Sequence, residues 1–111
     1  MRTNFCGELN KKFIGKEITI CGWIHRRRDH GGVIFLDIRD TTGIVQVVIR
    51  PEAKETFKIA EQVRSEFVLK ASGIVEERPE DSENTTLTTG EIEIKCSSIE
   101  VLNTAETTAY P

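Results

Sequence analysis

The chain has 111 residues, of which 38% are hydrophobic and 30% are charged, and its formal net charge is −3. This length and composition predict one globular domain rather than a disordered chain, and no apolar run is long enough to predict a membrane span. Residues 1–75 carry 13 Lys and Arg against 9 Asp and Glu, whereas residues 76–111 carry 2 against 9. The charge pattern therefore predicts a local basic patch with acidic surroundings, whereas a sequence-blind nucleic-acid binder would be more basic throughout.

The first half of the chain predicts three strands joined by tight turns. Apolar and polar residues alternate with a period of two, as they do in half-buried strands. We expect the strands over residues 16–28, 33–39 and 44–49, with turns at 29–32 and 40–43. Gly22 predicts a bend or bulge in the first strand. The apolar residues from Phe5 to Ile14 predict a short helix or loop that closes one end of the sheet.

The second half predicts one helix and two further strands. We expect Pro51 to open the helix, which ends near Ser65 and packs on the core through an apolar stripe at helical spacing. The fourth strand is expected over residues 66–75 with a bend at Gly73, and the fifth from 91 to 95 with a continuation to 102. Residues 76–90 are polar and predict a long loop, and residues 104–111 predict the start of a linker to a further domain.

The resulting order of elements is β-β-β-α-β-β. This order predicts an all-β fold over residues 1–103, namely a five-stranded Greek-key barrel with one helix between strands three and four. Such a barrel is an OB-fold, whose middle strands commonly bind oligonucleotides. An α+β sandwich with the same order of elements is the alternative.

Three side chains on different strands alternate away from the aliphatic partners of those strands: Phe35, Gln46 and Glu93. We therefore expect them on one outer face. A ring there stacks on a base, an amide both donates and accepts hydrogen bonds, and an ionised carboxylate selects a base with N–H donors such as guanine. Arg26 and Arg28 share one parity of their strand, so both are expected to reach one ligand, with the geometry that suits phosphate or a base edge.

Each of these residues also has a plainer interpretation. The arginines with Asp29 fit a solvated charge cluster, and Phe35 fits a plug at a barrel end. Gln46 and Glu93, taken singly, fit ordinary surface residues. Their expected convergence on one face favours the binding interpretation.

Other candidates are weaker. Arg78 fits either a phosphate contact or an ion-pair partner of its acidic neighbours, and His30 fits an ordinary turn residue. The three cysteines are widely spaced, so we expect buried thiols in a reducing cytoplasm, with neither a zinc site nor a disulfide framework. No nucleophile–base pair and no glycine-rich phosphate loop stands out, so we expect no catalytic site in this chain.

Several motifs together resemble the N-terminal anticodon-binding domain of bacterial aspartyl-tRNA synthetases, a branch of the class IIb aminoacyl-tRNA synthetases. They are Cys-Gly-Trp at 21–23, Arg-Arg-Arg-Asp-His-Gly-Gly at 26–32, Asp-Ile-Arg-Asp at 37–40, Gly-Ile-Val-Gln-Val-Val at 43–48 and Gly-Glu-Ile-Glu at 90–93. The resemblance covers nearly all of the chain. Two positions depart from the pattern: Arg50 stands where the family often has Asp, and residues 81–86 are acidic where the family usually has Asn-Pro.

The resemblance implies roles for the candidate residues. By similarity, Phe35 stacks on the middle anticodon base, a uridine that Gln46 also hydrogen-bonds, and Glu93 reads the first base, a guanine. Arg28, with Arg26 nearby, contacts the third base or adjacent phosphates. Arg78 makes a further contact from the long loop. With His30, the hairpin resembles that of the family members that accept the tRNAs of both aspartate and asparagine.

The resemblance also implies a larger protein. The family's enzyme attaches aspartate to tRNA with ATP and magnesium, in a class II catalytic domain that this chain lacks, and it is a homodimer. We therefore expect this fragment to bind tRNA as a monomer without a cofactor. A general single-strand-binding OB module and a protein-interaction OB domain are the two alternatives.

Overall fold

The computed structural model describes residues 3–79 and 90–103. The elements in chain order are two short 3-10 helices, η1 (Cys6–Glu8) and η2 (Lys11–Phe13), three strands, β1 (Glu17–His30), β2 (Val33–Asp40) and β3 (Gly43–Ile49), then α1 (Lys54–Gln62), β4 (Val68–Glu77) and β5 (Ile92–Asn103). The predicted linker at 104–111 and residues 80–89 of the predicted loop lie outside the described residues. In the described part of the chain, no helix is long and apolar enough to cross a membrane.

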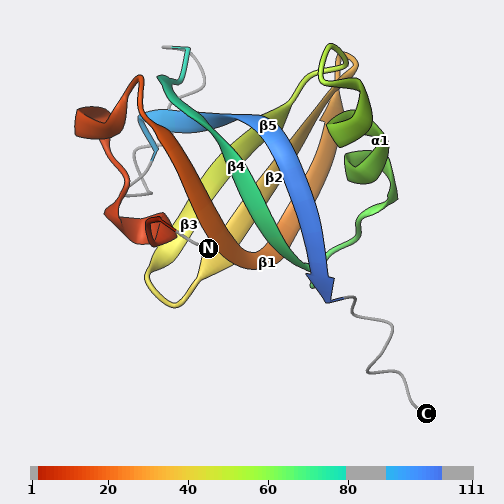
Figure 1. Ribbon diagram of the computed structural model, residues 1–111, viewed down its shortest axis with the longest axis horizontal. Helices are drawn as coiled ribbons and strands as arrows, with labels where there is room; N and C mark the ends of the chain where they lie inside the picture. Colours follow the sequence, from red (N-terminus) through yellow and green to blue (C-terminus); the bar gives the residue numbers. More distant parts are fainter. Residues whose placement is uncertain (1–2, 80–89, 104–111) are drawn as a thin grey trace.

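The strands close into a barrel in the order β1-β2-β3-β5-β4 (Figure 1). The pairs β1–β2, β2–β3, β1–β4 and β4–β5 are antiparallel, whereas β3 and β5 are parallel and close the barrel through the pairs Val47–Ile94 and Val48–Lys95. This topology confirms the predicted OB-fold and excludes the α+β sandwich.

The core lies inside the barrel and is built by the alternation of the strands. Ile34, Leu36 and Ile38 of β2 are at most 2% exposed, as their parity predicted. Each fully buried aliphatic side chain contributes about 1.5–3 kcal/mol relative to an exposed one. Inward-facing residues of the other strands complete the core: Ile20, Ile24, Val45, Val47, Ile49, Leu69, Ile92 and Ile94.

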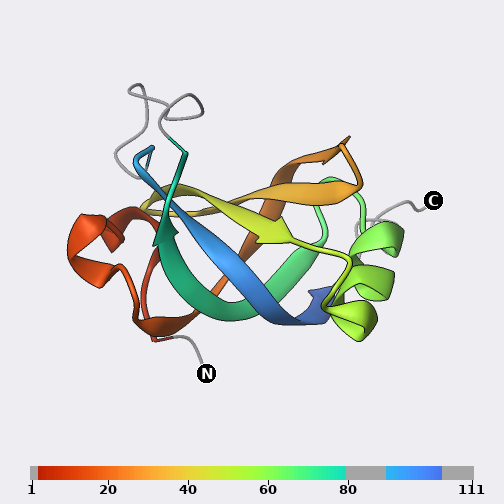
Figure 2. The same ribbon diagram turned by 90° about the horizontal axis from the view of Figure 1, so that it is seen from above.

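The two ends of the barrel are covered by different segments, α1 at one end and η1 and η2 at the other (Figures 1 and 2). Leu9, between η1 and η2, is 1% exposed, which confirms that the N-terminal segment closes an end. Asp40 holds this segment against the barrel, because its Oδ2 accepts a hydrogen bond of 2.7 Å from the backbone N–H of Cys6. Ala60 and Val63 are buried in the core at the other end, as the helical stripe predicted.

The predicted bounds of the helix were wrong at both ends. The helix starts at Lys54 rather than at Pro51, because Ala53 N–H donates to the Arg50 carbonyl at 3.0 Å and forms a turn before it. It ends at Gln62 rather than near Ser65, because Val63 is already extended (φ −76, ψ 156), and its side chain reaches the core. Arg50 is therefore not the helix cap, so its departure from the family pattern has no capping consequence.

The last two strands end later than predicted, and β4 also begins later, at Val68 rather than at residue 66. Strand β4 continues to Glu77, so the predicted loop begins later than residue 76. Strand β5 is one continuous element that includes the expected continuation. A register shift between Ser72 and Gly73 confirms the predicted bend in β4.

A bulge in β1 controls where the arginines point. Ile24 pairs with Ile38 and Arg26 with Asp37, so His25 is the extra residue on β1. We expected the bulge at Gly22, but it lies three residues later, at His25. Gly22 instead allows β1 to lie close to β2, because a Cβ at this position would lie 2.3 Å from the Arg39 carbonyl oxygen.

Candidate functional site

The bulge at His25 turns two arginines to the outer face of the sheet. Without the extra residue, Arg26 and Arg28 would share the inward parity of Ile24. With it, Arg26 lies opposite Asp37 in the β1–β2 register. Bulges commonly redirect side chains in this way next to binding sites.

Arg28 lies opposite Phe35 in the same register, two residues further along β1. The guanidinium carbon of Arg28 lies 5.5 Å from the centre of the half-buried Phe35 ring. This is within the range of a cation–π contact. The predicted pairing of an arginine with an outward aromatic ring is therefore present on this face.

Gln46 and Glu93 lie in direct contact, as the shared outer face predicted. Gln46 Nε2 donates to Glu93 Oε1 at 2.9 Å, from β3 to β5. Both residues are only 5% exposed, so their interpretation as ordinary surface residues is wrong. A buried amide and carboxylate that are hydrogen-bonded to each other form a specific polar site.

Arg28 joins the two halves of this face. Its Nη2 donates to Gln46 Oε1 at 3.0 Å and to Asp37 Oδ1 at 3.2 Å. Its Nε is shielded from solvent and has no hydrogen-bond partner among the described residues. A buried donor without a partner is uncommon in folded proteins. We call the set Arg28, Phe35, Asp37, Gln46 and Glu93 the outer-face cluster.

Burial dominates the electrostatics of Glu93. Burial raises the pKa of its carboxyl group above the usual value, against the opposing effects of the Gln46 hydrogen bond and of the positive charges on Arg50 and Arg78. The carboxylate is therefore held in a setting that disfavours its charge. Perturbed titration of this kind is more frequent at functional sites than elsewhere.

Arg78 lies beside the outer-face cluster and is 6% exposed. Its Nε donates to the Ile92 carbonyl at 3.0 Å. Burial lowers its pKa, and the charges of Glu93 and Asp37 oppose this effect. Arg78 is therefore buried and hydrogen-bonded to β5, near the carboxylates of Glu93 and Asp37, and is not an exposed loop residue.

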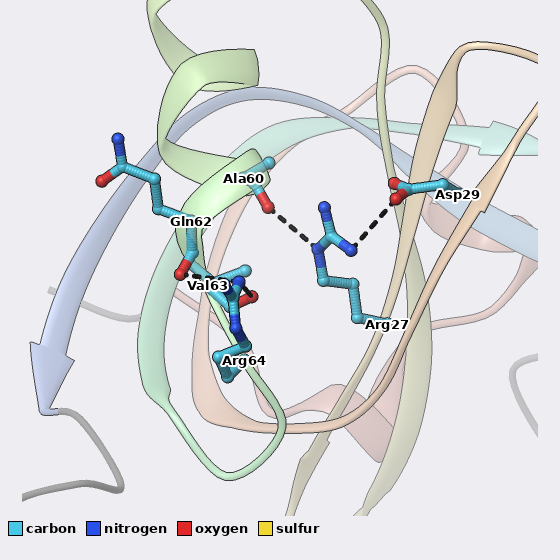
Figure 3. Close-up of polar contacts among 6 residues, drawn as sticks. All are labelled: Arg27, Asp29, Ala60, Gln62, Val63 and Arg64. Atoms are coloured by element: carbon cyan, nitrogen blue, oxygen red, sulfur yellow. Dashed lines mark hydrogen bonds and ion pairs between the residues drawn. The ribbon is translucent and has the colours of Figure 1, made fainter.

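Arg27 has the opposite parity and points away from the cluster. Its Nε donates to the Ala60 carbonyl of α1 at 3.1 Å, and its Nη1 pairs with Asp29 at 3.1 Å (Figure 3). Arg64 Nη1 donates to the carbonyls of Gln62 and Val63 at the same end of the helix. Cations at a helix C-terminus stabilise it, so this pair of arginines is structural.

Two of the predicted residues, Arg26 and His30, are not members of the outer-face cluster. Arg26 is exposed, on the same face as Arg28. His30 is exposed at the tip of the β1–β2 hairpin, opposite Val33. The interpretation of the arginines as a solvated charge cluster therefore fits only the exposed Arg26, because Arg27 is bonded to the Ala60 carbonyl and Arg28 to Asp37 and Gln46.

Sequence reasoning gave no role to two residues of this region. Asp37 shares the parity of Phe35 on β2, and this parity could have marked it as a partner of Arg28. The positive charge of Arg50 partly opposes the burial that raises the pKa of Glu93. Arg50 follows β3 with the same parity as Gln46, which could have indicated its position.

The chemistry of the outer-face cluster is that of recognition. It combines an aromatic ring, a guanidinium, an amide and a carboxylate, which together suit stacking on a base and hydrogen bonding to its edge. Among residues 3–79 and 90–103, no group of three or more His, Cys, Asp or Glu side chains is arranged to hold a metal ion.

Solved structures with similar folds include a tRNA synthetase and an OBody in complex with lysozyme. The asparaginyl-tRNA synthetase from Pyrococcus horikoshii complexed with asparaginyl-adenylate is 28% identical, with a TM-score of 0.80 over 100% of this chain and 24% of that one. This chain thus spans about a quarter of the synthetase chain that it matches. OBody AM2EP06, solved bound to hen egg-white lysozyme, is 28% identical with a TM-score of 0.80 over 95% of this chain and 96% of that one.

The aspartyl-tRNA synthetase from Entamoeba histolytica is 23% identical, with a TM-score of 0.80 over 100% of this chain and 22% of that one, and at this identity it supports the fold alone. A family model described as tRNA anti-codon, OB-fold nucleic acid binding domain, matches residues 18–102, which include every strand of the barrel apart from the ends of β1 and β5. This chain therefore belongs to the tRNA anti-codon family of OB-fold nucleic acid binding domains.

Proposed function

We propose that this domain binds the anticodon loop of aspartate tRNA as the recognition part of an aspartate–tRNA ligase of the bacterial type. The observation that carries the proposal is the contact between Gln46 and Glu93 at 2.9 Å, beside the paired Arg28 and Phe35. Amide, carboxylate and ring lie on one face, as single-stranded RNA recognition requires. The family match and the resemblance of residues 26–32 to the aspartyl branch support the same conclusion.

Each residue has a role in this proposal. Phe35 stacks on the middle base, and Gln46 hydrogen-bonds its edge. Glu93, when ionised, only accepts hydrogen bonds and therefore selects a first base with N–H donors, as guanine has. Arg28 and Arg26 contact the third base or adjacent phosphates.

Arg78, anchored on Ile92 beside Glu93, adds a positive charge at the first base. Residues 80–89 follow it and are acidic in part, so we assign them no contact. His30 at the hairpin tip is the residue that we propose to extend acceptance to asparagine tRNA. The corresponding test is whether the full-length enzyme aspartylates asparagine tRNA, and a clean failure would refute this extension.

The catalytic activity belongs to the remainder of the protein in this proposal. A catalytic domain outside the chain attaches aspartate with ATP and magnesium, in the cytoplasm and as a homodimer, and this domain supplies no catalytic group. This chain matches only 24% of the asparaginyl-tRNA synthetase chain, which supports such an arrangement.

The second candidate is a general single-strand-binding module. The contact of Arg28 with the Phe35 ring favours it, because a guanidinium and an aromatic ring accept any base. The Gln46–Glu93 pair argues against it, since a sequence-blind site has no use for a buried, hydrogen-bonded amide and carboxylate.

Titration of the domain with anticodon stem-loops tests the proposal. The loops carry G-U-C and its variants with each other base in the middle, together with G-U-U, in buffers of two salt concentrations. We expect tightest binding of G-U-C. Equal affinity for all middle bases would leave only the general module, and tighter binding of G-U-U would point to the asparaginyl branch. Binding that is absent at both salt concentrations would favour a protein-interaction domain.

A further inference from the structure

The side-chain amide of Gln46 is held between two charged groups, and this arrangement has a consequence for base selection. We infer that Arg28 and Glu93 lock the amide in one orientation, that this lock separates uracil from cytosine, and that Asp37 is a positioning residue for it. The inference rests on the proposed function, because it concerns the base that Gln46 would read.

Only one orientation of the amide satisfies both neighbours. A guanidinium can only donate, so the Gln46 atom that lies 3.0 Å from Arg28 Nη2 must be the oxygen Oε1. An ionised carboxylate can only accept, so the atom that lies 2.9 Å from Glu93 Oε1 must be the nitrogen Nε2. A flipped amide would bring N–H against guanidinium and oxygen against carboxylate. Because Gln46 is 5% exposed, water cannot compensate for these two lost bonds.

The lock leaves a fixed pair of hydrogen-bonding positions. An amide has two N–H groups and an oxygen that accepts two bonds, and the two neighbours use one of each. One N–H and one acceptor position of Gln46 therefore remain for a ligand, in a fixed order along the sheet.

Uracil and cytosine differ in this order. Uracil presents its N3–H donor beside a carbonyl acceptor, whereas cytosine presents an N3 acceptor beside an amino donor. An amide that is free to turn over matches both bases, but an amide held in one orientation matches one of them. The lock thus converts an adaptable residue into one that selects between two pyrimidines of nearly equal shape.

Asp37 supports the lock through its bond to Arg28. Its Oδ1 accepts from the same Nη2 that donates to Gln46, at 3.2 Å. Asp37 also lies directly opposite Gln46 in the β2–β3 register. It is therefore placed to hold the guanidinium beside the Gln46 oxygen, and so to act on the amide through Arg28.

The experiment compares the Asp37→Ala and Asp37→Asn variants with the unmodified chain, by titration with stem-loops carrying G-U-C and G-C-C. We expect Asp37→Ala to reduce the ratio of uracil to cytosine affinity on the order of tenfold, the scale of one bidentate base contact. Asp37→Asn keeps an oxygen that accepts from Arg28 and should retain most of the ratio. A purely structural role would weaken both complexes equally, so an unchanged ratio in a folded Asp37→Ala variant would overturn the inference.

Two variants of Arg28 provide an independent test if Asp37→Ala does not fold. Arg28→Lys retains a group that only donates, and we expect it to keep the base ratio while overall affinity falls. Arg28→Gln can present either an N–H or an oxygen to Gln46, and we expect it to lose the ratio. Equal ratios in these two variants would contradict the lock. If the unmodified chain binds both loops equally, the proposed function fails together with the lock, whereas a uracil preference that survives every variant refutes the lock alone.

Discussion

Gln46 of β3 and Glu93 of β5 are joined by a hydrogen bond of 2.9 Å between residues 47 positions apart in the chain. The bond brings an amide and a carboxylate together on the outer face, but it does not remove the cost of burying the Glu93 charge. The pKa of Glu93 remains raised, with burial as its largest cause. The site is therefore less stable than it would be with a neutral residue in this position.

We expect Glu93→Gln to stabilise the free domain at neutral pH and to weaken binding of the G-U-C loop. Because the folded-state pKa of Glu93 is raised, its favourable contribution is present below the unfolded pKa and is lost as the pH rises through the folded pKa. The gain in unfolding free energy should stay below the roughly 1–3 kcal/mol of an unsatisfied buried polar group. Denaturant unfolding at a series of pH values from 4 to 8 measures it.

The matched control for this prediction is Glu61→Gln, which makes the same charge change at an exposed position of α1. It should alter neither the pH dependence nor the affinity. A Glu93→Gln domain that is less stable than the unmodified chain at every pH would contradict the prediction.

Phe35→Ala should weaken RNA binding by about 1–3 kcal/mol, the range for stacking of one base on an aromatic side chain. Phe35 is half-buried on the outer face rather than in the core, so we expect a smaller effect on folding than on affinity. Fluorescence titration with the G-U-C stem-loop measures the change. Phe5→Ala, at an exposed aromatic residue before η1, is the control. An affinity that is unchanged by Phe35→Ala would exclude the stacking role.

Arg27→Gln and Arg28→Gln should affect different properties, although the two arginines are neighbours: the first stability, the second RNA affinity. The first removes the bond from Arg27 Nε to the Ala60 carbonyl, and we expect a loss of about 0.5–1.5 kcal/mol in unfolding free energy with affinity changed less than about threefold. The second should reduce RNA affinity more strongly. Chemical denaturation and titration of both variants test this separation, and an Arg27→Gln domain that loses RNA binding while fully folded would refute it.

Asp40 should make the domain sensitive to acid. Burial acts to raise the pKa of its carboxyl group, but hydrogen bonds from Thr42 and from Cys6 N–H outweigh this effect and lower the pKa. A lowered pKa gives stability that is present above the unfolded value of about 4 and is lost as the pH falls through the folded value. Asp40→Asn should therefore be less stable at pH 7 and should lose less stability on acidification. Parallel pH-dependent curves for the two proteins would contradict this.

The alternation of apolar residues was sufficient to predict the barrel, its inward-facing side chains and the meeting of Gln46 with Glu93. These features depend on period and order, which are local properties of the chain. The burial of Glu93 could not be predicted in the same way, since the side chains that shield an outer face come from other strands. The outward direction of Arg28 depended on the bulge at His25, and no glycine or proline marks that residue.

The start of the helix was mispredicted for a different reason. Pro51 suits the first position of a helix, but it also suits a turn, and the backbone bond from Ala53 to Arg50 selects the turn. Local sequence preference does not decide between these two outcomes. The packing of Ala60 and Val63 into the end of the barrel fixes where the helix must lie.

The parallel pairing of β3 with β5 has a consequence for the order of folding. Strands β1, β2 and β3 are joined by short turns and can pair early, whereas the β3–β5 contact must close a loop of nearly fifty residues. The β1–β4 pairs, such as Glu17 with Ile74, must close loops of similar or greater length, so both contacts are expected late, and Gln46 and Glu93 lie beside the β3–β5 contact. We therefore expect the recognition surface to be absent from any partly folded chain, so that a newly made or damaged domain cannot retain tRNA before its barrel is complete. Pulsed hydrogen exchange should show the amides at Val48 and Ile94 gaining protection after those of the β1–β2 hairpin.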